Sequence, residues 1–227
     1  MIRFDFIVLA ISLSSTSALA QSVDRAAVNA QLVGSPTLTE QEMRTVLQPN
    51  PSPKFGNMRY IHPVMKGLLY RAGGKGGAHP LGDGELNALC GLGFSAVDYA
   101  YDGQKPTTIS CGSNSYTYQT VPYSPRQAGV FLSHIYNAVR QNLGPVMIHC
   151  WNGWHESGLM SVYALIQFCG SKGWNATTGW EYWRSTTGDN PDNPQYLGIK
   201  NMINSFQRQA GMDLTPTEIN DLCPSTR

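Results

Sequence analysis

The sequence predicts an α/β protein, a three-layer sandwich in which a largely parallel sheet of about four to five strands is flanked by helices. Short apolar segments with strand patterns alternate with helical patterns from about residue 66 onward. A capped amphipathic helix that begins near residue 124 leads directly into an apolar strand at residues 146–149. The chain of 227 residues is long enough to bury one core, and it shows no internal repeat.

The first 20 residues have the pattern of a secretory signal peptide. Arg3 precedes an apolar run that is too short to span a bilayer, and small residues ending at Ala20 form a cleavage signal. An uncleaved anchor is the alternative. No later stretch approaches about eighteen consecutive apolar residues, so we expect a secreted or periplasmic protein with no membrane span after cleavage.

Two further regions follow the signal peptide. Residues 21–65 are expected to form a lead-in that packs on the domain, with one short helix begun by a capping box of Thr39 and Glu42. Residues 66–227 are expected to form the domain itself. Its C-terminal third is predicted to be helical, with a last short helix that begins at Thr215.

The first half of the domain is predicted to alternate strands with one helix. A strand is expected at residues 67–73 and is followed by a glycine-rich loop. Asp83 is expected to cap a helix that ends at the glycines around Leu92. Three more strands are predicted at residues 95–101, 107–111 and 115–123.

The helix before the apolar strand has the strongest local pattern in the chain. Ser124 is expected as its N-cap, Pro125 at its first position and Gln127 as the partner in a capping box. Apolar residues recur at helical spacing at Val130, Phe131, Ile135, Ala138 and Val139. Gly144 and Pro145 are expected to end the helix and to begin the strand.

Composition and motif spacing argue against several classes of ligand. A net charge of +1 and 14% charged residues argue against a nucleic-acid binder that relies on bulk electrostatics. The glycine-rich loop lacks the ending of a phosphate-binding Walker motif, and the Asn/Asp cluster at residues 188–194 lacks the spacing of a calcium loop. We therefore expect no cofactor, no metal and no nucleic-acid partner; the oligomeric state stays open.

Five cysteines in an exported chain leave one unpaired if the others form disulfides. We expect the pairs Cys90 with Cys111 and Cys169 with Cys223, which is one of three ways to join four cysteines. The alternative is that some of them are buried thiols. Cys150 is then the free cysteine, and a reactive role would explain why it is kept.

Cys150 lies where the predicted strand at residues 146–149 meets an apolar helix. The free amide groups and the dipole at the start of a helix favour a thiolate and can hold an oxyanion. Gly153 would let the connecting loop curl, and the Ser157 hydroxyl could donate to the sulfur. The carboxyl ends of parallel strands are also where such sheets bind ligands.

The segment "HCWNGWHESG" resembles the signature loop of the cysteine-dependent protein tyrosine and dual-specificity phosphatases. That loop reads His-Cys, five residues, Arg, then Ser or Thr and Gly. The segments "LLYRAGGKGG" and "ELNALCGLGFSAVDYAYDG" resemble the entry strand and the following segment of bacterial members, so the likeness covers about residues 66–170. It implies the phosphatase-type sandwich and a phosphorylated or otherwise anionic substrate.

The resemblance also implies roles for individual residues. Cys150 would be the nucleophile that forms a phosphocysteine, His149 would tune it, and Ser157 would help the thiolate to leave. The backbone amides of residues 151–156 would line the anion site. The loop residues between Cys150 and Glu156 are Trp151, Asn152, Gly153, Trp154 and His155.

Two departures set this chain apart from that family. Glu156 occupies the position of the arginine that binds phosphate with two hydrogen bonds, which removes both the geometry and the charge. No Asp or Glu occurs at residues 103–155, where the family carries its general acid. His155, a protonated Glu156 or Tyr123 could donate the proton instead.

Cations from elsewhere could replace the missing arginine. Candidates are Arg71 and Lys75 near the glycine-rich loop, and Arg184. The alternative for Arg71 is a structural ion pair, and for Lys75 a solvated surface position. Trp151 and Trp154 flank the nucleophile and could stack on a ligand, although core packing explains tryptophans equally well.

Three functions remain open from the sequence, and the retained pair of His149 and Cys150 together with Ser157 favours a cysteine-dependent hydrolase over a binding module. The first is an atypical cysteine-dependent phosphatase that takes a small-molecule or phosphorylated substrate. The second is a catalytically inactive pseudophosphatase that acts as a binding module. The third is a hydrolase in which Cys150 and Glu156 act on a substrate without phosphate.

Overall fold

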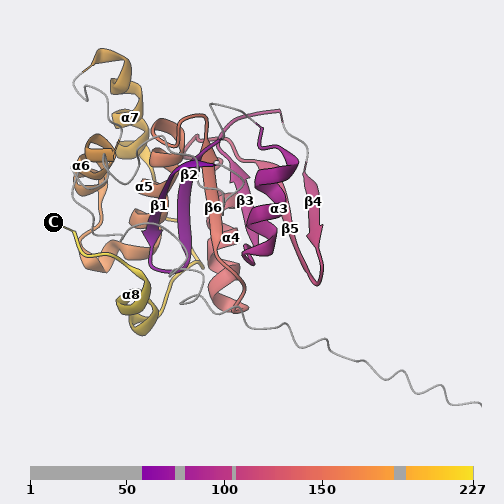
Figure 1. The fold of residues 1–227 in the computed structure, drawn as a ribbon. Coiled ribbons are helices and arrows are strands. Elements are labelled where there is room, and N and C mark those ends of the chain that lie inside the picture. Colours follow the sequence, from indigo (N-terminus) through magenta and orange to yellow (C-terminus); the bar gives the residue numbers. More distant parts are fainter. Residues whose placement is uncertain (1–57, 75–79, 104–105, 187–192, 227) are drawn as a thin grey trace, which may run out of the picture.

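The computed structural model describes residues 58–74, 80–103, 106–186 and 193–226. The predicted helix at Thr39 to Glu42 and the candidate Lys75 lie outside the described residues. A six-stranded sheet with the order β1-β2-β6-β3-β5-β4 crosses the molecule (Figure 1). Its strands are β1 (Arg59–Met65), β2 (Leu69–Gly73), β3 (Ala96–Tyr99), β4 (Thr107–Cys111), β5 (Asn114–Thr120) and β6 (Val146–Cys150).

The sheet is parallel at its centre and antiparallel at its edges. Strands β2, β6, β3 and β5 pair in parallel, whereas β1 pairs antiparallel with β2, and β4 antiparallel with β5. The predicted α/β sandwich is therefore confirmed, with six strands where about four to five were expected. The extra strand is β1, at residues assigned to the lead-in. Its pattern is obscured by Pro63 and by register shifts, which are typical of an edge strand.

Helices cover both faces of the sheet (Figure 1). They are α3 (Asp83–Gly91), α4 (Gly129–Arg140), α5 (His155–Cys169), α6 (Ala176–Thr186), α7 (Leu197–Ser205) and α8 (Pro216–Leu222), with 3-10 turns η3 (Gly170–Lys172) and η4 (Pro194–Tyr196). One core forms between the sheet and α3, and a larger one involves α4, α5 and the C-terminal helices. Helix α5 is buried along most of its length, so the site at its first turn is anchored in the main core.

Two helix starts differ from the sequence prediction. Helix α4 begins at Gly129 after an Ala128 N-cap, because residues 124–128 form turns in which the Gln127 amide bonds to the Ser124 carbonyl at 3.0 Å. Helix α3 has Gly82 as its N-cap, and the Glu85 carboxylate accepts a bond from the Gly82 amide at 3.1 Å. Helix α8 begins as predicted, with Thr215 as its N-cap.

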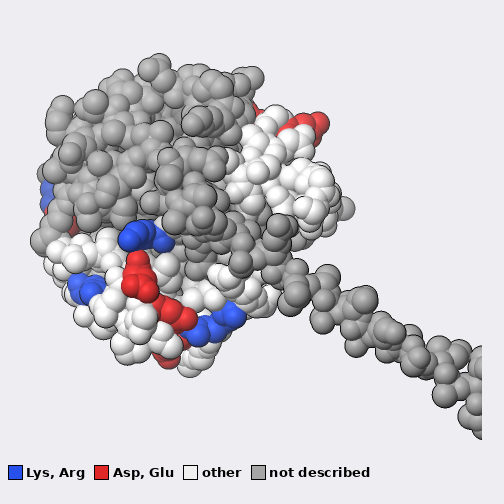
Figure 2. Space-filling view, turned by 60° about the horizontal axis from the view of Figure 1, so that its bottom comes forward, with Lys and Arg blue, Asp and Glu red and all other residues white. Residues whose placement is uncertain are grey.

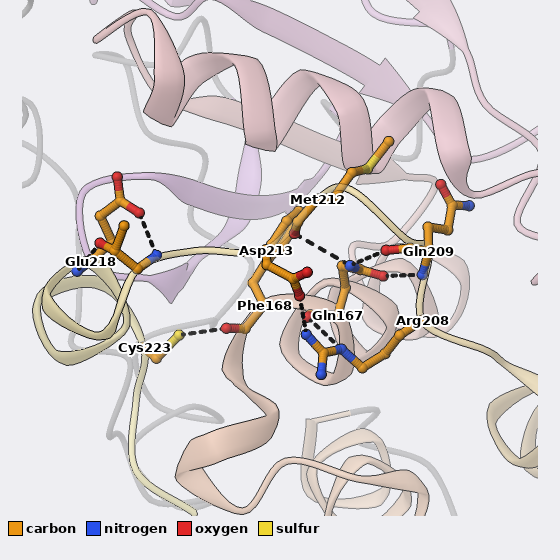
Figure 3. A network of polar contacts seen from close by, with 9 residues as sticks. Gln167, Phe168, Arg208, Gln209, Met212, Asp213, Glu218 and Cys223 are labelled. Atoms are coloured by element: carbon orange, nitrogen blue, oxygen red, sulfur yellow. Dashed lines mark hydrogen bonds and ion pairs between the residues drawn. The ribbon is translucent and has the colours of Figure 1, made fainter.

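The segment after α7 forms hydrogen bonds with the C-terminal end of α5 (Figure 3). The Gln167 amide nitrogen donates to the carbonyls of Gln209 and Met212, and its oxygen accepts from the Gln209 amide at 2.7 Å. Arg208 donates to the Gln167 carbonyl at 3.0 Å and pairs with Asp213. These bonds satisfy a fully buried polar side chain and hold the segment after α7 against the core.

Both predicted disulfides are present. They join Cys90 to Cys111 and Cys169 to Cys223, and Cys150 is the free cysteine. The first bridge ties α3 to the edge strand β4, and the second ties the end of α5 to the segment after α8. The interpretation of Cys150 as the odd thiol is therefore confirmed.

The described residues include no membrane-spanning helix. The face that they form in Figure 2 is not strongly charged. No helix among them is both long and apolar enough to cross a bilayer. Where described residues form that face, basic and acidic side chains lie next to one another (Figure 2). This mixture agrees with the near-neutral net charge of +1.

Candidate functional site

Cys150 is the last residue of β6, at the carboxyl edge of the parallel strands. It is 1% exposed and lies beside Gly73 of β2 in the sheet register. A four-residue connection, 151–154, leads from Cys150 to the first turn of α5. The strand–cysteine–helix arrangement expected from the sequence is thus present.

Two glycines shape this connection. Gly153 has a φ of +78°, and a Cβ there would lie 2.5 Å from the Gly73 nitrogen. A Cβ on Gly73 would lie 2.6 Å from the Asn152 carbonyl carbon. The Gly74 amide also donates to the Trp151 carbonyl at 3.1 Å. The loop is therefore folded closely against the end of β2, and larger side chains cannot enter this contact without movement.

The Cys150 sulfur lies 3.2 Å from the Ser157 hydroxyl oxygen. It also receives backbone hydrogen bonds from Gly153 and Ser157, which favour the thiolate. Burial and, second, the Glu156 carboxylate outweigh these bonds and raise the pKa of the Cys150 thiol above its ordinary value. The loop geometry thus matches the expectation, whereas burial and Glu156 oppose the thiolate that the sequence predicts.

Glu156 lies in the first turn of α5 and is partly buried. Its carboxylate accepts a hydrogen bond from the Tyr101 hydroxyl, and burial together with the charges of Glu156 and Cys150 raises the pKa of Tyr101. Burial, Cys150 and Glu156 also raise the pKa of Tyr99 to about 12. Among the described residues, no Lys, Arg or His forms an ion pair with Glu156. In the described part of the site, the Glu156 carboxylate and the Cys150 thiol therefore lie beside tyrosine hydroxyls.

His149 points to the opposite face of the sheet from Cys150, because neighbouring strand residues alternate. Its ring stacks on Tyr99, with centroids 4.7 Å apart, and its Nε2 lies 3.1 Å from the Tyr118 hydroxyl oxygen. The arrangement holds the end of β6 against two aromatic rings. A tuning role for His149 remains a prediction, and it would act through the backbone of this strand end.

Arg71 is fully buried on β2, in register with Ile148. Its two terminal nitrogens donate to the Thr186 hydroxyl at 2.9 Å and to the Thr186 carbonyl at 3.0 Å, and its guanidinium lies 5.7 Å from the Tyr182 ring centroid. No carboxylate among the described residues forms an ion pair with it. Arg71 therefore fixes the C-terminal end of α6, which differs from both expectations for it.

The other candidate cation in the described residues is also engaged elsewhere. Arg184 lies 3.5 Å from the Glu181 carboxylate, one turn away on α6. Both Arg71 and Arg184 thus form hydrogen bonds with residues of α6.

The aromatic residues of the loop lie in different surroundings. Trp151 is 51% exposed, whereas Trp154 packs against Tyr60 with ring centroids 5.2 Å apart. His155 lies between two aromatic rings of the C-terminal region, and its carbonyl accepts a hydrogen bond from the Trp183 indole at 3.0 Å. Tyr123 lies 6.3 Å from Tyr101, so this candidate acid belongs to the tyrosine cluster near Glu156.

Sequence reasoning missed Tyr99 and Tyr101. Both occur in "SAVDYAY", which was expected to be a strand, and β3 turns out to lie directly beside β6. A residue at the carboxyl end of a strand adjacent to the cysteine strand is a site candidate. The sequence pattern predicted the strand that carries both tyrosines, but it did not show that this strand lies next to the cysteine strand. Among the described residues, no cluster of metal-binding side chains occurs.

The sequence matches no protein-family model and none of the curated proteins. Among solved structures, the phosphatase Tk-PTP in its active form is similar at 18% identity and a TM-score of 0.41, covering 63% of this chain and 97% of that one. TpbA from P. aeruginosa is similar at 17% identity and a TM-score of 0.37, covering 60% and 78%. A variant of TpbA in complex with pTyr gives 16% identity and a TM-score of 0.38, covering 68% and 93%.

Proposed function

We propose that this chain is an exported phosphatase-fold protein that does not turn over phosphate monoesters and uses its Cys150 loop as a binding site. The observation that carries the proposal is the Glu156 carboxylate beside a buried thiol whose pKa is raised. Phosphoryl transfer to cysteine needs a thiolate, and recognition of the dianion needs positive charge. The described part of the site offers neither.

Electrostatics gives the size of the effect. Two unit charges about 5 Å apart at an effective dielectric near 20 interact by roughly 3 kcal/mol. Replacing arginine by glutamate changes the local charge by two units, so a bound anion loses about twice that amount before any relaxation. The amide donors of residues 151–156 would each contribute about 1.5–3 kcal/mol to a bound anion with either residue at position 156, so they do not replace the lost charge.

A missing general acid supports the same proposal. The sequence has no Asp or Glu at residues 103–155. The raised pKa values of Tyr99 and Tyr101, the tyrosines that interact with Glu156, make them poor acids at neutral pH. Without a general acid to protonate the leaving group, the rate of phosphate ester hydrolysis would fall by about 10²–10⁴-fold.

A second candidate is a Cys150 hydrolase whose substrate is not phosphorylated. The hydrogen bond from Tyr101 to Glu156 and the contact of Ser157 with the sulfur favour it. These groups could hold and move a proton next to Cys150, and a neutral or cationic substrate would not be repelled by Glu156.

The test compares hydrolysis of p-nitrophenyl phosphate and p-nitrophenyl acetate by the wild type, Cys150→Ser and Glu156→Arg. The proposal predicts that the wild type hydrolyses the phosphate no faster than Cys150→Ser. It also predicts that Glu156→Arg binds tungstate, a phosphate mimic, more tightly than the wild type. Fast phosphate turnover that disappears in Cys150→Ser would overturn the proposal, and ester hydrolysis with the same dependence would favour the second candidate.

A further inference from the structure

A cavity of about 410 Å³ lies between helices α6 and α7. Both helices are in the upper left of Figure 1. The volume of the cavity falls within the roughly 300–1,000 Å³ typical of small-molecule sites. Residues of both helices line it, among them Trp180, Glu181, Arg184, Leu197, Lys200 and Asn204. No residue of the Cys150 loop takes part in this lining.

Trp180 gives the cavity a flat and rigid wall. Its ring is partly buried and stacks on Trp183, with centroids 5.2 Å apart and planes 10° from parallel. Trp183 is fully buried, and its indole nitrogen donates to the His155 carbonyl. Because the supporting ring is fixed in the core, Trp180 presents its surface without an ordering cost on binding.

The lining carries the side chains of two cations, Arg184 and Lys200, and of one acid, Glu181. Arg184 and Glu181 pair with each other at 3.5 Å. The ammonium of Lys200 lies 5.6 Å from the Trp180 ring centroid, and no carboxylate among the described residues forms an ion pair with it. Lys200 is exposed and has a flexible stem, so it can turn toward a ligand that carries an anionic group.

The remaining groups favour a ligand rich in hydroxyls. Glu181, Arg184 and Asn204 surround the aromatic wall with acceptors and donors. A flat apolar ligand would remove water from these groups without replacing its hydrogen bonds, which is unfavourable. A bare inorganic anion would use Lys200 but neither Trp180 nor Leu197, whose side chain is 60% exposed.

We propose that the α6–α7 cavity binds a saccharide that carries a carboxylate, such as a uronic acid unit of an acidic polysaccharide. The apolar face of the sugar ring would pack on Trp180 in place of the Lys200 ammonium, and its hydroxyl groups would bond to Asn204 and to the Glu181–Arg184 pair. Its carboxylate would pair with Lys200. This site is separate from the Cys150 loop, so the proposal does not depend on the function assigned to that loop.

The test is calorimetric titration of the purified protein with trigalacturonic acid, the neutral galactose trimer and sodium acetate. We expect saturable binding of the acidic trimer, weaker binding of the neutral trimer and none of acetate. Trp180→Ala should lower the affinity for the acidic trimer about tenfold, because aromatic stacking contributes on that scale. Lys200→Gln should lower it about threefold and leave the neutral trimer unchanged, as for an exposed ion pair.

Two controls keep the result decisive. Lys172→Gln changes a lysine outside the cavity and should bind like the wild type. Asn204→Ala changes an exposed position of α7 and should weaken binding of both trimers without affecting folding, which covers the case that Trp180→Ala does not fold. The proposal is overturned if the acidic trimer does not bind, if acetate binds as well, or if Lys200→Gln and Asn204→Ala both bind it like the wild type.

Discussion

The Cys150 sulfur and the Ser157 hydroxyl oxygen lie 3.2 Å apart at the start of α5, in a contact that would stabilise a thiolate. Yet burial and the Glu156 carboxylate raise the pKa of Cys150. A loop shape suited to nucleophilic catalysis is therefore combined with a charge that opposes it.

Replacing Glu156 by Gln should lower the pKa of Cys150, because it removes the second-largest cause of the upward shift while burial remains. The thiolate absorbance at 240 nm, followed over pH, measures the change, and the four other cysteines are bonded in disulfides and do not interfere. Glu181→Gln is the control, since Glu181 pairs with Arg184 on α6. An equal pKa of Cys150 in both variants would show that Glu156 does not act on the thiol.

Replacing Gly153 by Ala should destabilise the fold more than replacing Gly211 by Ala. The two glycines have nearly the same φ, +78° and +79°, but a Cβ has open space at Gly211 and lies 2.5 Å from the Gly73 nitrogen at Gly153. The left-handed backbone costs about 1–2 kcal/mol at either position, and the clash adds about 1–3 kcal/mol at Gly153. Urea unfolding of both variants measures the difference, and equal losses would contradict the close contact of the loop with β2.

Replacing Thr186 by Val should destabilise the protein by about 1–3 kcal/mol, because it leaves a buried N–H group of Arg71 without its acceptor. Thr177→Val is the matched control on the same helix, at an exposed position. Thermal or urea unfolding measures both variants. Equal stability of the two would show that Arg71 does not depend on the Thr186 hydroxyl.

The contribution of His134 to stability should fall as pH rises. His134 Nδ1 lies 2.9 Å from the Asp98 carboxylate, which is buried. Burial alone would lower the pKa of His134, but the hydrogen bond and charge of Asp98 raise it overall. The folded protein then holds a proton that the unfolded chain releases near its ordinary pKa of about 6.5. Stabilisation is therefore complete below that value and is lost as pH passes the folded pKa.

The melting temperatures of the wild type and His134→Gln measure this effect. The wild type should exceed the variant by more at about pH 5.5 than at about pH 9. A difference that is constant with pH, or larger at the alkaline end, would contradict the paired and protonated state of His134.

Much of the fold followed from local patterns in the sequence. The strand that ends at Cys150 and the helix after it follow from short-range periodicity. The odd number of cysteines predicts one free thiol, and the expected disulfide pairing, one of three possible pairings, is the one present. By contrast, β1 was not predicted as a strand, because Pro63 and the register shifts hide its alternation. The start of α4 was placed too early, because Ser124 and Gln127 bond as a turn before the helix begins.

The candidate site could be predicted only in part. Cys150, Ser157 and Glu156 belong to one continuous segment, so spacing alone brings them together. The hydrogen bond of Tyr101 to Glu156 depends on β3 lying beside β6, which is a property of strand order. The charge state of Cys150 depends on burial, which no local pattern reports.

The most direct test of the central claim is the pKa of Cys150 in the wild-type protein. The ¹³C shift of its Cβ, followed by NMR from about pH 6 to 11 with the disulfides intact, reports the thiolate without requiring access of a reagent. We predict a midpoint above the ordinary cysteine value of about 8.5. A midpoint at or below about pH 7, as in activated cysteines, would contradict the account of a thiol kept protonated beside Glu156.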